Sequence, residues 1–538
     1  MKAFFTLGLM SLLFILKQAA AQNTEQWNFV LNGAGDGTEE LFGMTVDTFG
    51  NTILIATTDT GFLDYATVII KLNPQGNKVW MSAPNLNGPV GEPVAVLTDD
   101  SGNIYVAGSY DSPGNLSSDI YLVKLDTAGN QLWAKYYSSP GNVIDDAKGM
   151  LWDNAGNLIV IGETGSTVST TDALVVKFDS AGNQLWQSVY SNPVNKQDQV
   201  EAAAVDAANN IYVCGNVYVD TSRYRDFQVF KMDSSGTVEW ARTYNDSMNY
   251  GDQCTAIIVD NNGDIIVTGE STGWGPGYPV NEIATIKYDA TGNVQWITRY
   301  ETSTSTAIPS GIAVDENDNI YIVGSAYDGT TKFDCITIKY NASGNEQWVR
   351  LIQGTQVDAD GGSDILYDEG KIYVAGYVAN NSTYDDALVA AYDVSGNLLY
   401  REEWNSAQND EDDFSYIAKD EDGNLIAAGI VEKFNDDDLL VVKFSVANVS
   451  INEPEAATFT VYPNPTSGEL NLQGLQFEAG ADIGIFNLLG KEVYFTQFSH
   501  TASNIKIQTN NMEDGMYLLR VKSGGYYQTK PVIVQRKN

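Results

Sequence analysis

Residues 147–190 read Ala147-Lys-Gly-Met-Leu-Trp-Asp153, Gly156-Asn-Leu-Ile-Val-Ile-Gly-Glu163, Asp172-Ala-Leu-Val-Val-Lys-Phe-Asp179 and Gly182-Asn-Gln-Leu-Trp-Gln-Ser-Val-Tyr190. Each segment is a short run rich in Val, Ile, Leu and Tyr, bounded by Asp, Gly and Asn. These are signals of β-strands joined by tight hairpins, because Gly and Asn tolerate the positive φ that such turns require. The stretch therefore predicts four consecutive antiparallel strands and no helix.

This four-strand unit repeats along the chain at a nearly constant spacing. The aromatic residue of its fourth strand recurs as Trp27, Trp80, Trp133, Trp186, Trp240, Trp296, Trp348 and Tyr400. The steps are 53, 53, 53, 54, 56, 52 and 52 residues. A period near 50 with short strands inside each unit is typical of toroidal or solenoidal repeat proteins.

Four strands per unit in eight units predict a β-propeller. The first repeat element, around Trp27, is a fourth strand, whereas the last, Leu439 to Phe444, is a third strand. We infer that the Trp27 strand completes the eighth unit. The predicted fold is all-β: an eight-bladed β-propeller of four-stranded blades, closed by the N-terminal strand and followed by a small C-terminal β-sandwich.

The chain begins with features of a secretory signal peptide. Met1-Lys2 precedes an apolar run from Phe4 to Leu16 and the small residues Ala19-Ala20-Ala21. The run is too short to span a bilayer, and no later segment reaches the roughly 20 apolar residues of a spanning helix. We therefore expect a signal peptide at 1–21, the propeller at 22–448, a linker at 449–458, a further domain at 459–538 and no transmembrane segment.

The last 80 or so residues contain Phe459-Thr-Val-Tyr-Pro-Asn-Pro-Thr-Ser-Gly468, Asp482-Ile-Gly-Ile-Phe-Asn-Leu-Leu-Gly-Lys-Glu-Val493 and Asp514-Gly-Met-Tyr-Leu-Leu-Arg-Val521. They resemble the type A C-terminal sorting domain of the bacterial type IX secretion system. The matching positions are Tyr462, Pro463, Asn464, Pro465, Gly468, Gly490, Gly515 and Tyr517. In that family the domain is a small β-sandwich read by the outer-membrane translocon. The resemblance implies that translocon as a partner and a secreted or surface-anchored protein.

The repeat unit resembles the bacterial SBBP β-propeller repeat, whose copies read like Gly311-Ile-Ala-Val-Asp315 followed by Asn319-Ile-Tyr-Ile-Val-Gly324. That family is defined by its fold and implies no shared chemistry.

We expect the Trp row to pack between neighbouring blades. A second row lies in the third strands, and we expect it to be a solvated face: Lys71, Lys124, Lys177, Lys231, Lys287, Lys339 and Lys443.

The formal net charge is −39, and residues 453–538 hold 8 acidic against 7 basic side chains, so the propeller carries the excess. Such a surface repels phosphates, which predicts no nucleic-acid partner.

Many acids precede the first or third strand of a unit: Asp36, Glu39, Asp64, Asp119, Asp145, Asp146, Asp172, Asp198, Glu201, Asp226, Asp252, Asp334, Asp358, Asp360, Asp386, Asp410, Asp412, Asp413 and Asp438. Both loop sets emerge on one face of a meandering blade, so we expect a ring of carboxylates around the channel. Such oxygens suit Ca²⁺, the one candidate cofactor, although acidity for solubility alone is the alternative.

The fifth unit departs from the pattern through its long loop, Ser271-Thr-Gly-Trp-Gly-Pro-Gly-Tyr-Pro-Val-Asn-Glu282. Trp274 and Tyr278 are extra to the repeat, and loops on rigid scaffolds often carry binding residues. With the neighbouring acids Asp252 and Glu282, they are the predicted binding residues. A loop packed inertly on its neighbour is the alternative.

The sequence supplies few groups for catalysis. The one histidine is His500, in the C-terminal domain, so the propeller lacks the commonest general base. The odd set Cys214, Cys254 and Cys335 argues against a disulfide framework, but leaves a Cys214–Cys254 pair open. Our leading hypothesis is a non-catalytic exported propeller that binds a carbohydrate, protein or other surface polymer. A polysaccharide lyase or hydrolase using paired carboxylates is the alternative, and a structural surface-layer component is a third.

Overall fold

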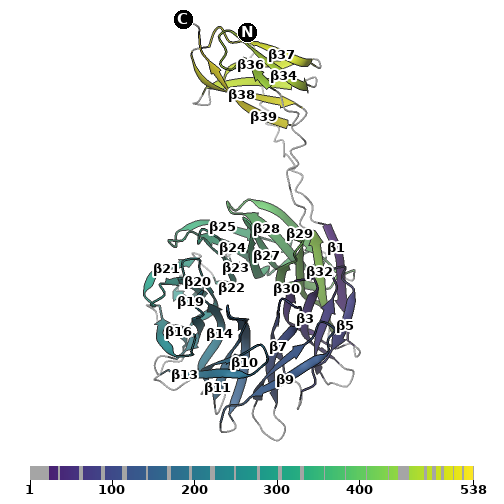
Figure 1. Cartoon of the computed structure of the whole chain (residues 1–538), viewed down its shortest axis with the longest axis vertical. Helices are drawn as coiled ribbons and strands as arrows, with labels where there is room; N and C mark the ends of the chain where they lie inside the picture. Colours follow the sequence, from purple (N-terminus) through teal and green to yellow (C-terminus); the bar gives the residue numbers. More distant parts are fainter. Residues whose placement is uncertain are drawn as a thin grey trace, which may run out of the picture. The chain divides into compact units, whose positions relative to one another are not determined.

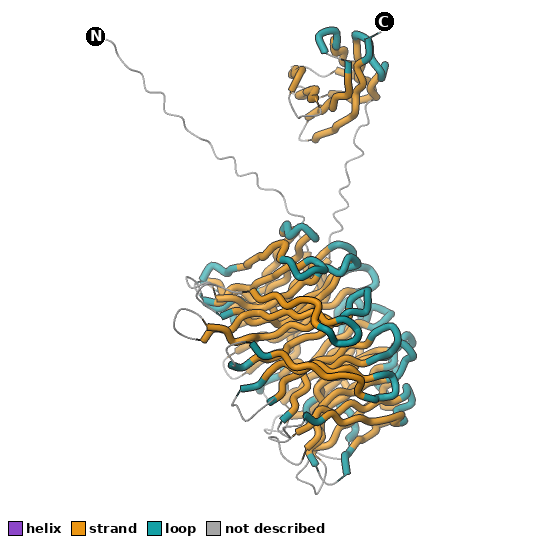
Figure 2. The backbone as a smooth tube through the Cα atoms, turned by 90° about the vertical axis from the view of Figure 1, so that its left-hand side faces the viewer, coloured by secondary structure: helices purple, strands orange, loops and turns teal. Residues whose placement is uncertain are grey.

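The computed structural model divides into two compact units, residues 1–446 and 447–538. It describes residues 24–33, 37–59, 65–86, 91–111, 118–140, 143–165, 171–192, 197–218, 224–246, 250–274, 279–300, 306–327, 332–356, 358–381, 383–407, 409–433, 436–445, 460–477, 481–487, 492–498, 502–512, 514–523 and 526–536. The predicted signal peptide and linker lie outside these residues. Strands and the loops between them make up the described chain, with no helix among these residues (Figure 2).

The described residues of the first unit form eight antiparallel four-stranded sheets, numbered here in chain order. Sheet 1 has β2 (Glu40–Val46), β3 (Thr52–Asp59), β4 (Tyr65–Leu72) and β5 (Lys78–Ser82); sheet 2 has β6 (Pro93–Thr98), β7 (Ile104–Asp111), β8 (Ser118–Leu125) and β9 (Gln131–Tyr137); sheet 3 has β10 (Ile144–Trp152), β11 (Leu158–Gly165), β12 (Thr171–Phe178) and β13 (Gln184–Tyr190); sheet 4 has β14 (Asp198–Val205), β15 (Ile211–Val217), β16 (Asp226–Met232) and β17 (Val238–Tyr244). Sheet 5 has β18 (Asp252–Val259), β19 (Ile265–Trp274), β20 (Pro279–Tyr288) and β21 (Val294–Tyr300); sheet 6 has β22 (Ala307–Val314), β23 (Ile320–Tyr327), β24 (Phe333–Tyr340) and β25 (Glu346–Ile352); sheet 7 has β26 (Gly361–Asp368), β27 (Lys371–Asn380), β28 (Tyr384–Asp393) and β29 (Leu398–Trp404).

Sheet 8 is built from both ends of the unit. It orders β30 (Glu411–Lys419), β31 (Leu425–Lys433), β32 (Asp436–Ser445) and β1 (Thr24–Leu31). The pairing of β1 with β32 is antiparallel and places Trp27 opposite Lys443. One hydrophobic cluster then joins sheets 8 and 1, with Ile426 and Val441 packed among Leu54 and Ile70.

The sheets succeed one another around a common centre, with β10, β14, β22 and β30 toward the middle and β5, β9 and β13 toward the rim (Figure 1). The hydrophobic core lies between successive sheets. One cluster, for example, combines Tyr212 and Cys214 of sheet 4 with Ile265 and Val267 of sheet 5. Radially stacked four-stranded sheets of this kind form a β-propeller.

The prediction that the Trp row packs between sheets is confirmed. Each indole lies against a turn of the next sheet, as Trp240 of sheet 4 does against Gly292 of sheet 5. The indole N–H donates to a backbone carbonyl of that turn at 3.0–3.2 Å in six copies: Trp27 to Pro74, Trp80 to Thr127, Trp186 to Ser234, Trp240 to Ala290, Trp296 to Ala342 and Trp348 to Val394. The row therefore joins neighbouring sheets by packing and by hydrogen bonds.

The prediction that the Lys row is solvated is wrong. Lys71, Lys177, Lys287 and Lys443 are each at most 5 % exposed. Their ammonium groups lie 2.6–3.0 Å from the aspartates that open the first hairpin turn of the same sheet: Asp47, Asp153, Asp260 and Asp420. A buried charge needs a partner, and the turn aspartate, which also accepts backbone N–H groups of its own turn, provides it.

The second unit has two antiparallel sheets. One orders β33 (Thr460–Tyr462), β34 (Glu469–Phe477) and β37 (Ala502–Gln508), and the other orders β36 (Glu492–Phe498), β35 (Ala481–Asn487), β38 (Gly515–Ser523) and β39 (Tyr526–Val534). A single core holds Leu472 and Ile505 of the first sheet with Ile485 and Leu519 of the second. Two sheets that share one core form a β-sandwich.

Candidate functional site

In six connections between successive sheets, a carboxylate at or just before the first strand accepts the backbone N–H of the residue six positions earlier. The pairs are Glu39 with Gly33, Asp145 with Ser139, Asp198 with Asn192, Asp252 with Asp246, Asp360 with Gly354 and Asp412 with Ser406, at 2.5–3.0 Å. Each of these side chains is at most 1 % exposed. We call them the loop-stapling carboxylates, because the bond closes each connection on itself.

The acids before the third strands are buried as well. Asp119, Asp226, Asp334, Asp386 and Asp438 are at most 6 % exposed. These five and the six loop-stapling carboxylates therefore do not expose their charges to solvent, and the ring of carboxylates around the channel stays a prediction. Asp36 and Asp64 lie outside the described residues.

Loop-stapling and third-strand carboxylates face each other across the sheet boundaries. Burial raises the pKa of Asp198 to about 6, and the charge of Asp172 adds to that rise. Burial also raises the pKa of Asp360 to about 6, and the charge of Asp334 adds to that rise. The pKa of Asp412 is raised to about 7 by burial and by the charges of Asp386 and Asp410. Neighbouring carboxylates in a dry site hold protons or cations more tightly than exposed ones.

The structure brings two of the predicted binding residues into one buried network. Asp252 accepts the Ser271 hydroxyl at 2.5 Å, and Glu282 lies 2.8 Å from the Arg299 guanidinium. Arg299 also donates to Ser271 at 3.0 Å, so the two carboxylates are linked through protein groups. Trp274 ends β19 with its backbone opposite Pro279, while its side chain and Tyr278 lie outside the described residues. Ligand binding by these four residues stays a prediction.

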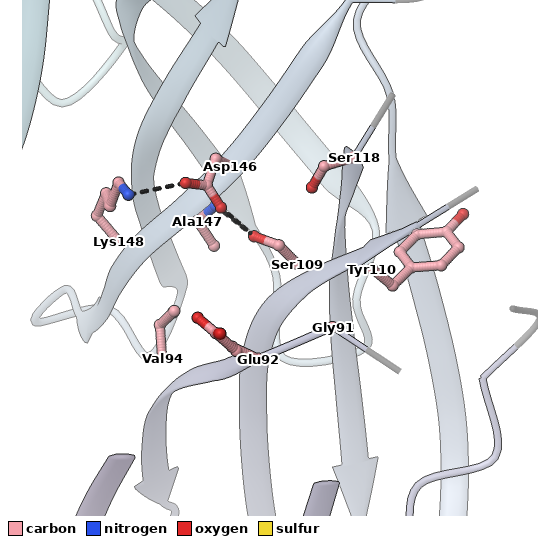
Figure 3. A pocket seen from close by; sticks show the side chains of 9 residues that line it. All are labelled: Gly91, Glu92, Val94, Ser109, Tyr110, Ser118, Asp146, Ala147 and Lys148. Carbon is pink, nitrogen blue, oxygen red and sulfur yellow. Dashed lines mark hydrogen bonds and ion pairs between the residues drawn. The ribbon is translucent and has the colours of Figure 1, made fainter. Parts of the chain in front are cut away.

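A polar pocket of about 360 Å³ lies between sheets 2 and 3. Its lining residues are Gly91, Glu92, Val94, Ser109, Tyr110, Ser118, Asp146, Ala147 and Lys148. Figure 3 shows Asp146 held between Lys148 and Ser109, with Glu92 and Val94 on the other side of the hollow. The two contacts of Asp146 are 2.7 Å each, to the Lys148 ammonium and to the Ser109 hydroxyl.

The charge in this pocket is mixed. Burial alone would lower the pKa of Lys148, but its bond to Asp146 and the charges of Asp146, Glu163 and Glu201 raise it, so the ammonium stays charged. The pocket thus combines one cation, two carboxylates and two serine hydroxyls, and it can both donate and accept hydrogen bonds. Sequence reasoning missed it, although Lys148 replaces the Glu201, Thr255 and Ser310 of neighbouring copies.

An acidic pocket of about 290 Å³ lies between sheets 7 and 8. Its lining residues are Ala359, Tyr377, Asp385, Glu411, Asp412, Asp413 and Glu432. The pKa of Asp385 is raised to about 6 by burial and by the charges of Glu411, Asp358, Asp360 and Glu432. Glu411 stands opposite Glu432 in the β30–β31 ladder, a placement of like charges that destabilises a sheet. The pocket is lined by five carboxylates and no cationic side chain.

One group of three carboxylates among the described residues is compact enough to hold a metal ion. Glu39, Asp436 and Asp438 offer ligand atoms that all lie within 4.8 Å of one another, at the boundary between sheets 8 and 1. Glu39 is also bonded to Thr58, at 2.9 Å. The three cysteines are buried free thiols. Cys214 and Cys254 lie in one hydrophobic core. Burial there raises the pKa of the Cys254 thiol, and the neighbouring Cys214 raises it further.

Comparison with known families matches two parts of the chain. Residues 460–535 match the secretion system C-terminal sorting domain, and residues 295–328 match the SBBP β-propeller repeat. The chain is a β-propeller repeat protein with a C-terminal type IX secretion sorting domain. The sorting domain implies an interaction with the secretion system and supports export to the cell surface.

Two of the predicted sorting-motif residues have defined places in this domain. Asn464 accepts the backbone N–H of Ile533 at 2.8 Å, and Tyr517 lies in the core. Gly490 lies outside the described residues.

Solved structures resemble the propeller only distantly. PorZ, a surface component of the type IX secretion system of Porphyromonas gingivalis, is 15% identical, with 92% of this chain and 66% of that chain covered and a TM-score of 0.36. The WD40 domain of SCAP from fission yeast is 11% identical over 77% and 98% of the two chains, with a TM-score of 0.39. An ulvan lyase bound to a glucuronic acid–sulfated rhamnose unit is 10% identical over 70% and 96%, also at 0.39. TM-scores this low carry no information about function.

No curated protein matches the chain in sequence. Among the described residues, no helix is long and apolar enough to cross a membrane.

Proposed function

We propose that the chain is an exported, non-catalytic, eight-bladed propeller closed by β1, which binds a carbohydrate or other surface polymer through the loop face that carries its acids. Closure is supported by the pairing of β1 with β32 and by the core shared between sheets 8 and 1. Export is supported by the sorting domain.

The observation that carries the binding proposal is the pocket between sheets 2 and 3. Its polar lining groups include an ammonium, two carboxylates and two serine hydroxyls within one hollow of about 360 Å³. Sugar hydroxyls both donate and accept hydrogen bonds, so they suit a pocket that offers both kinds of partner. Asp146 is fixed by Lys148 and Ser109, which gives the pocket a preformed shape.

The charge of the pocket favours uncharged glycans over acidic ones. Glu92 and Asp146 oppose the single charge of Lys148, and the whole chain carries a formal charge of −39. A uronic acid or a sulfated sugar would enter against that field. We therefore expect neutral polysaccharides to bind more tightly than acidic ones at low ionic strength, where screening is weakest.

The test is a binding titration of the full chain with neutral and acidic polysaccharides. We expect Glu92→Gln and Lys148→Ala each to weaken binding of a neutral polymer by about tenfold, the effect of losing one hydrogen bond to a charged group. Lys332→Ala is the matched control, because Lys332 forms an exposed ion pair with Asp358 outside this pocket. Equal affinities in all three variants, or no binding by the wild type, would refute the proposal.

The same samples distinguish the alternative function. Glu92 and Asp146 line one pocket, and glycoside cleavage requires a pair of carboxylates. Release of new chain ends by the wild type, lost in Glu92→Gln, would identify a polysaccharide-cleaving enzyme. Binding without any release supports the non-catalytic propeller.

A further inference from the structure

The acidic pocket between sheets 7 and 8 gathers negative charge that no cation among its described lining residues balances. Its five carboxylates belong to Asp385, Glu411, Asp412, Asp413 and Glu432. Three cations of these two sheets pair with other acids: Arg401 with Glu403, Lys419 with Asp368 and Lys443 with Asp420. Like charges in one hollow repel one another, so a cationic ligand would stabilise this pocket.

The carboxylates of the pocket lie close enough to act on one another. Glu411 stands opposite Glu432 in the β30–β31 ladder. Burial raises the pKa of Asp385, and the charges of Glu411 and Glu432 raise it further. Burial also raises the pKa of Asp413, and the charge of Glu432 adds to that rise. Acids from β28, β30 and β31 therefore face one hollow.

Asp412 adds a buried acceptor that no described donor satisfies. Its side chain is 1 % exposed, and its Oδ2 accepts the Ser406 N–H at 2.6 Å. Its Oδ1 is buried and receives no hydrogen bond from the described groups. The second oxygen of Asp198 accepts the Asn192 amide at 2.7 Å, and that of Asp360 accepts a backbone N–H at 2.6 Å. Because a buried oxygen without a donor is costly, the Asp412 position favours a ligand that donates an N–H.

The spacing of the carboxylates favours an organic cation over a metal ion. Among the described residues, the one group of three carboxylates whose ligand atoms all lie within 4.8 Å of one another is Glu39, Asp436 and Asp438. The five carboxylates of the acidic pocket are all described, and no three of them are that close. A guanidinium group spans a wider set of acceptors, because it directs five N–H donors outward from a planar fork.

The pocket also offers a flat apolar surface. Tyr377 is among its lining residues. The ring lies against Gly361, where an added Cβ would come 2.6 Å from Cε1 of Tyr377, so the backbone holds the ring in place. Guanidinium groups stack on aromatic rings as well as binding carboxylates.

We propose that the acidic pocket binds a guanidinium group, with the buried Oδ1 of Asp412 and the carboxylates of Asp385 and Glu432 among its acceptors. A hollow of about 290 Å³ is at the small end of ligand sites, so it fits one side chain or a small cation. The guanidinium can belong to a small molecule or to an arginine of another protein, and the test separates the two sources. This site is separate from the polymer pocket between sheets 2 and 3, so either can fail without the other.

The test is isothermal titration of the full chain, in EDTA, with agmatine, which carries a guanidinium and an ammonium group. Butane-1,4-diamine is the matched ligand, because it has the same chain and charge but an ammonium in place of the guanidinium. We expect agmatine to bind about tenfold more tightly than the diamine, the effect of one further hydrogen bond to a charged group. Binding of acetyl-Gly-Arg-Gly-amide as well would indicate an arginine of a protein partner, whereas binding of agmatine alone would indicate a small molecule.

Two variants test the acceptors. Asp385→Asn and Glu432→Gln should each weaken agmatine binding by about tenfold. Each should also raise the urea midpoint of the unliganded chain, because it removes one of the charges that repel each other. Glu421→Gln is the matched control, since Glu421 is exposed in the turn at the other end of the β30–β31 ladder, and it should change neither quantity.

Four results would overturn the assignment. The wild type could bind neither agmatine nor the peptide at millimolar concentration. Agmatine and the diamine could bind equally well, which would contradict the choice of a guanidinium. Asp385→Asn and Glu421→Gln could weaken binding equally, which would reduce the effect to overall charge. The urea midpoints of unliganded Asp385→Asn and Glu432→Gln could fall, which would show that protein groups already stabilise these carboxylates.

Discussion

Replacing Gly292 with alanine tests whether the Trp row holds the sheets together. Gly292 lies in the turn between β20 and β21 at φ 79°, and an added Cβ would come 2.7 Å from Cδ2 of Trp240. The indole cannot simply move away, because its N–H is bonded to Ala290 of the same turn. Gly263, in the turn between β18 and β19 of the same sheet, has φ 81° and open space where its Cβ would be.

The two substitutions share one cost and differ in the other. A left-handed backbone costs an alanine about 1–2 kcal/mol, and this applies at both positions. Forcing an extra methyl group into a packed contact costs about 1–3 kcal/mol more, and this applies only at Gly292. We therefore expect Gly292→Ala to lower the free energy of unfolding by about 2–5 kcal/mol and Gly263→Ala by about 1–2 kcal/mol.

Urea unfolding followed by tryptophan fluorescence measures this difference in the propeller alone, because all ten tryptophans precede residue 447. In a Trp240→Ala background the extra cost of Gly292→Ala should disappear, since the indole is gone, while the cost of Gly263→Ala should not change. Equal losses for the two glycine variants, or a Gly292→Ala loss that persists without Trp240, would refute the reasoning.

Two further predictions concern buried charges. Lys287→Met should lower the free energy of unfolding by about 3–5 kcal/mol, because it leaves the buried Asp260 carboxylate without its partner. Lys332→Met, at an exposed ion pair, should lower it by less than about 1 kcal/mol. Urea midpoints that match in the two variants would contradict this prediction. The raised pKa values of Asp198, Asp360 and Asp412 mean that the folded state binds protons more tightly than the unfolded state, so stability in EDTA should rise as the pH falls from 8 towards about 5. Below about 4 the lowered pKa values of Asp153 and Asp420 reverse the trend, since protonation then breaks their lysine pairs. Urea midpoints that fall or stay level between pH 8 and pH 5 would count against buried carboxylate pairs.

The sequence predicts the sheets well because their signals are local and repeated. The turns around Gly156 and Gly263 have the positive φ that their Gly-Asn and Gly-Asp sequences require. The position of Trp240 within its unit was enough to predict packing against the next sheet. The observation that Trp27 begins the array with a fourth strand predicts that the N-terminal strand joins the last sheet, and β1 does pair with β32.

The charged side chains were misjudged because their partners are distant in sequence. Lys177 lies on the third strand, 24 residues after Asp153, and nothing local shows that the two meet in the interior. The loop-stapling carboxylates have a local partner six residues earlier, as Asp198 has in Asn192, but that partner is a backbone N–H, which carries no sequence signal. A lysine row and a turn-aspartate row with the same period were the available clue.

The polymer pocket could not be predicted either, because it depends on how two sheets meet. Glu92, Ser109 and Lys148 come from three separate segments, and only Lys148 departs visibly from its repeat.

Because sheet 8 contains both the first and the last strand of the propeller, it can be completed only late in synthesis. Its rim strand, β1, is made at the start of synthesis, yet its partner β32 follows only after about 400 residues, so this contact closes one of the longest loops in the chain. Until β32 is made, β1 has no strand to pair with, and partly made chains keep an unpaired edge that invites aggregation. The sorting domain, which begins with β33 at Thr460, comes after β32 in the chain. The sorting domain is therefore completed only after every strand of sheets 1 to 8 has been made, so the secretion system cannot recognise it before those sheets are able to fold.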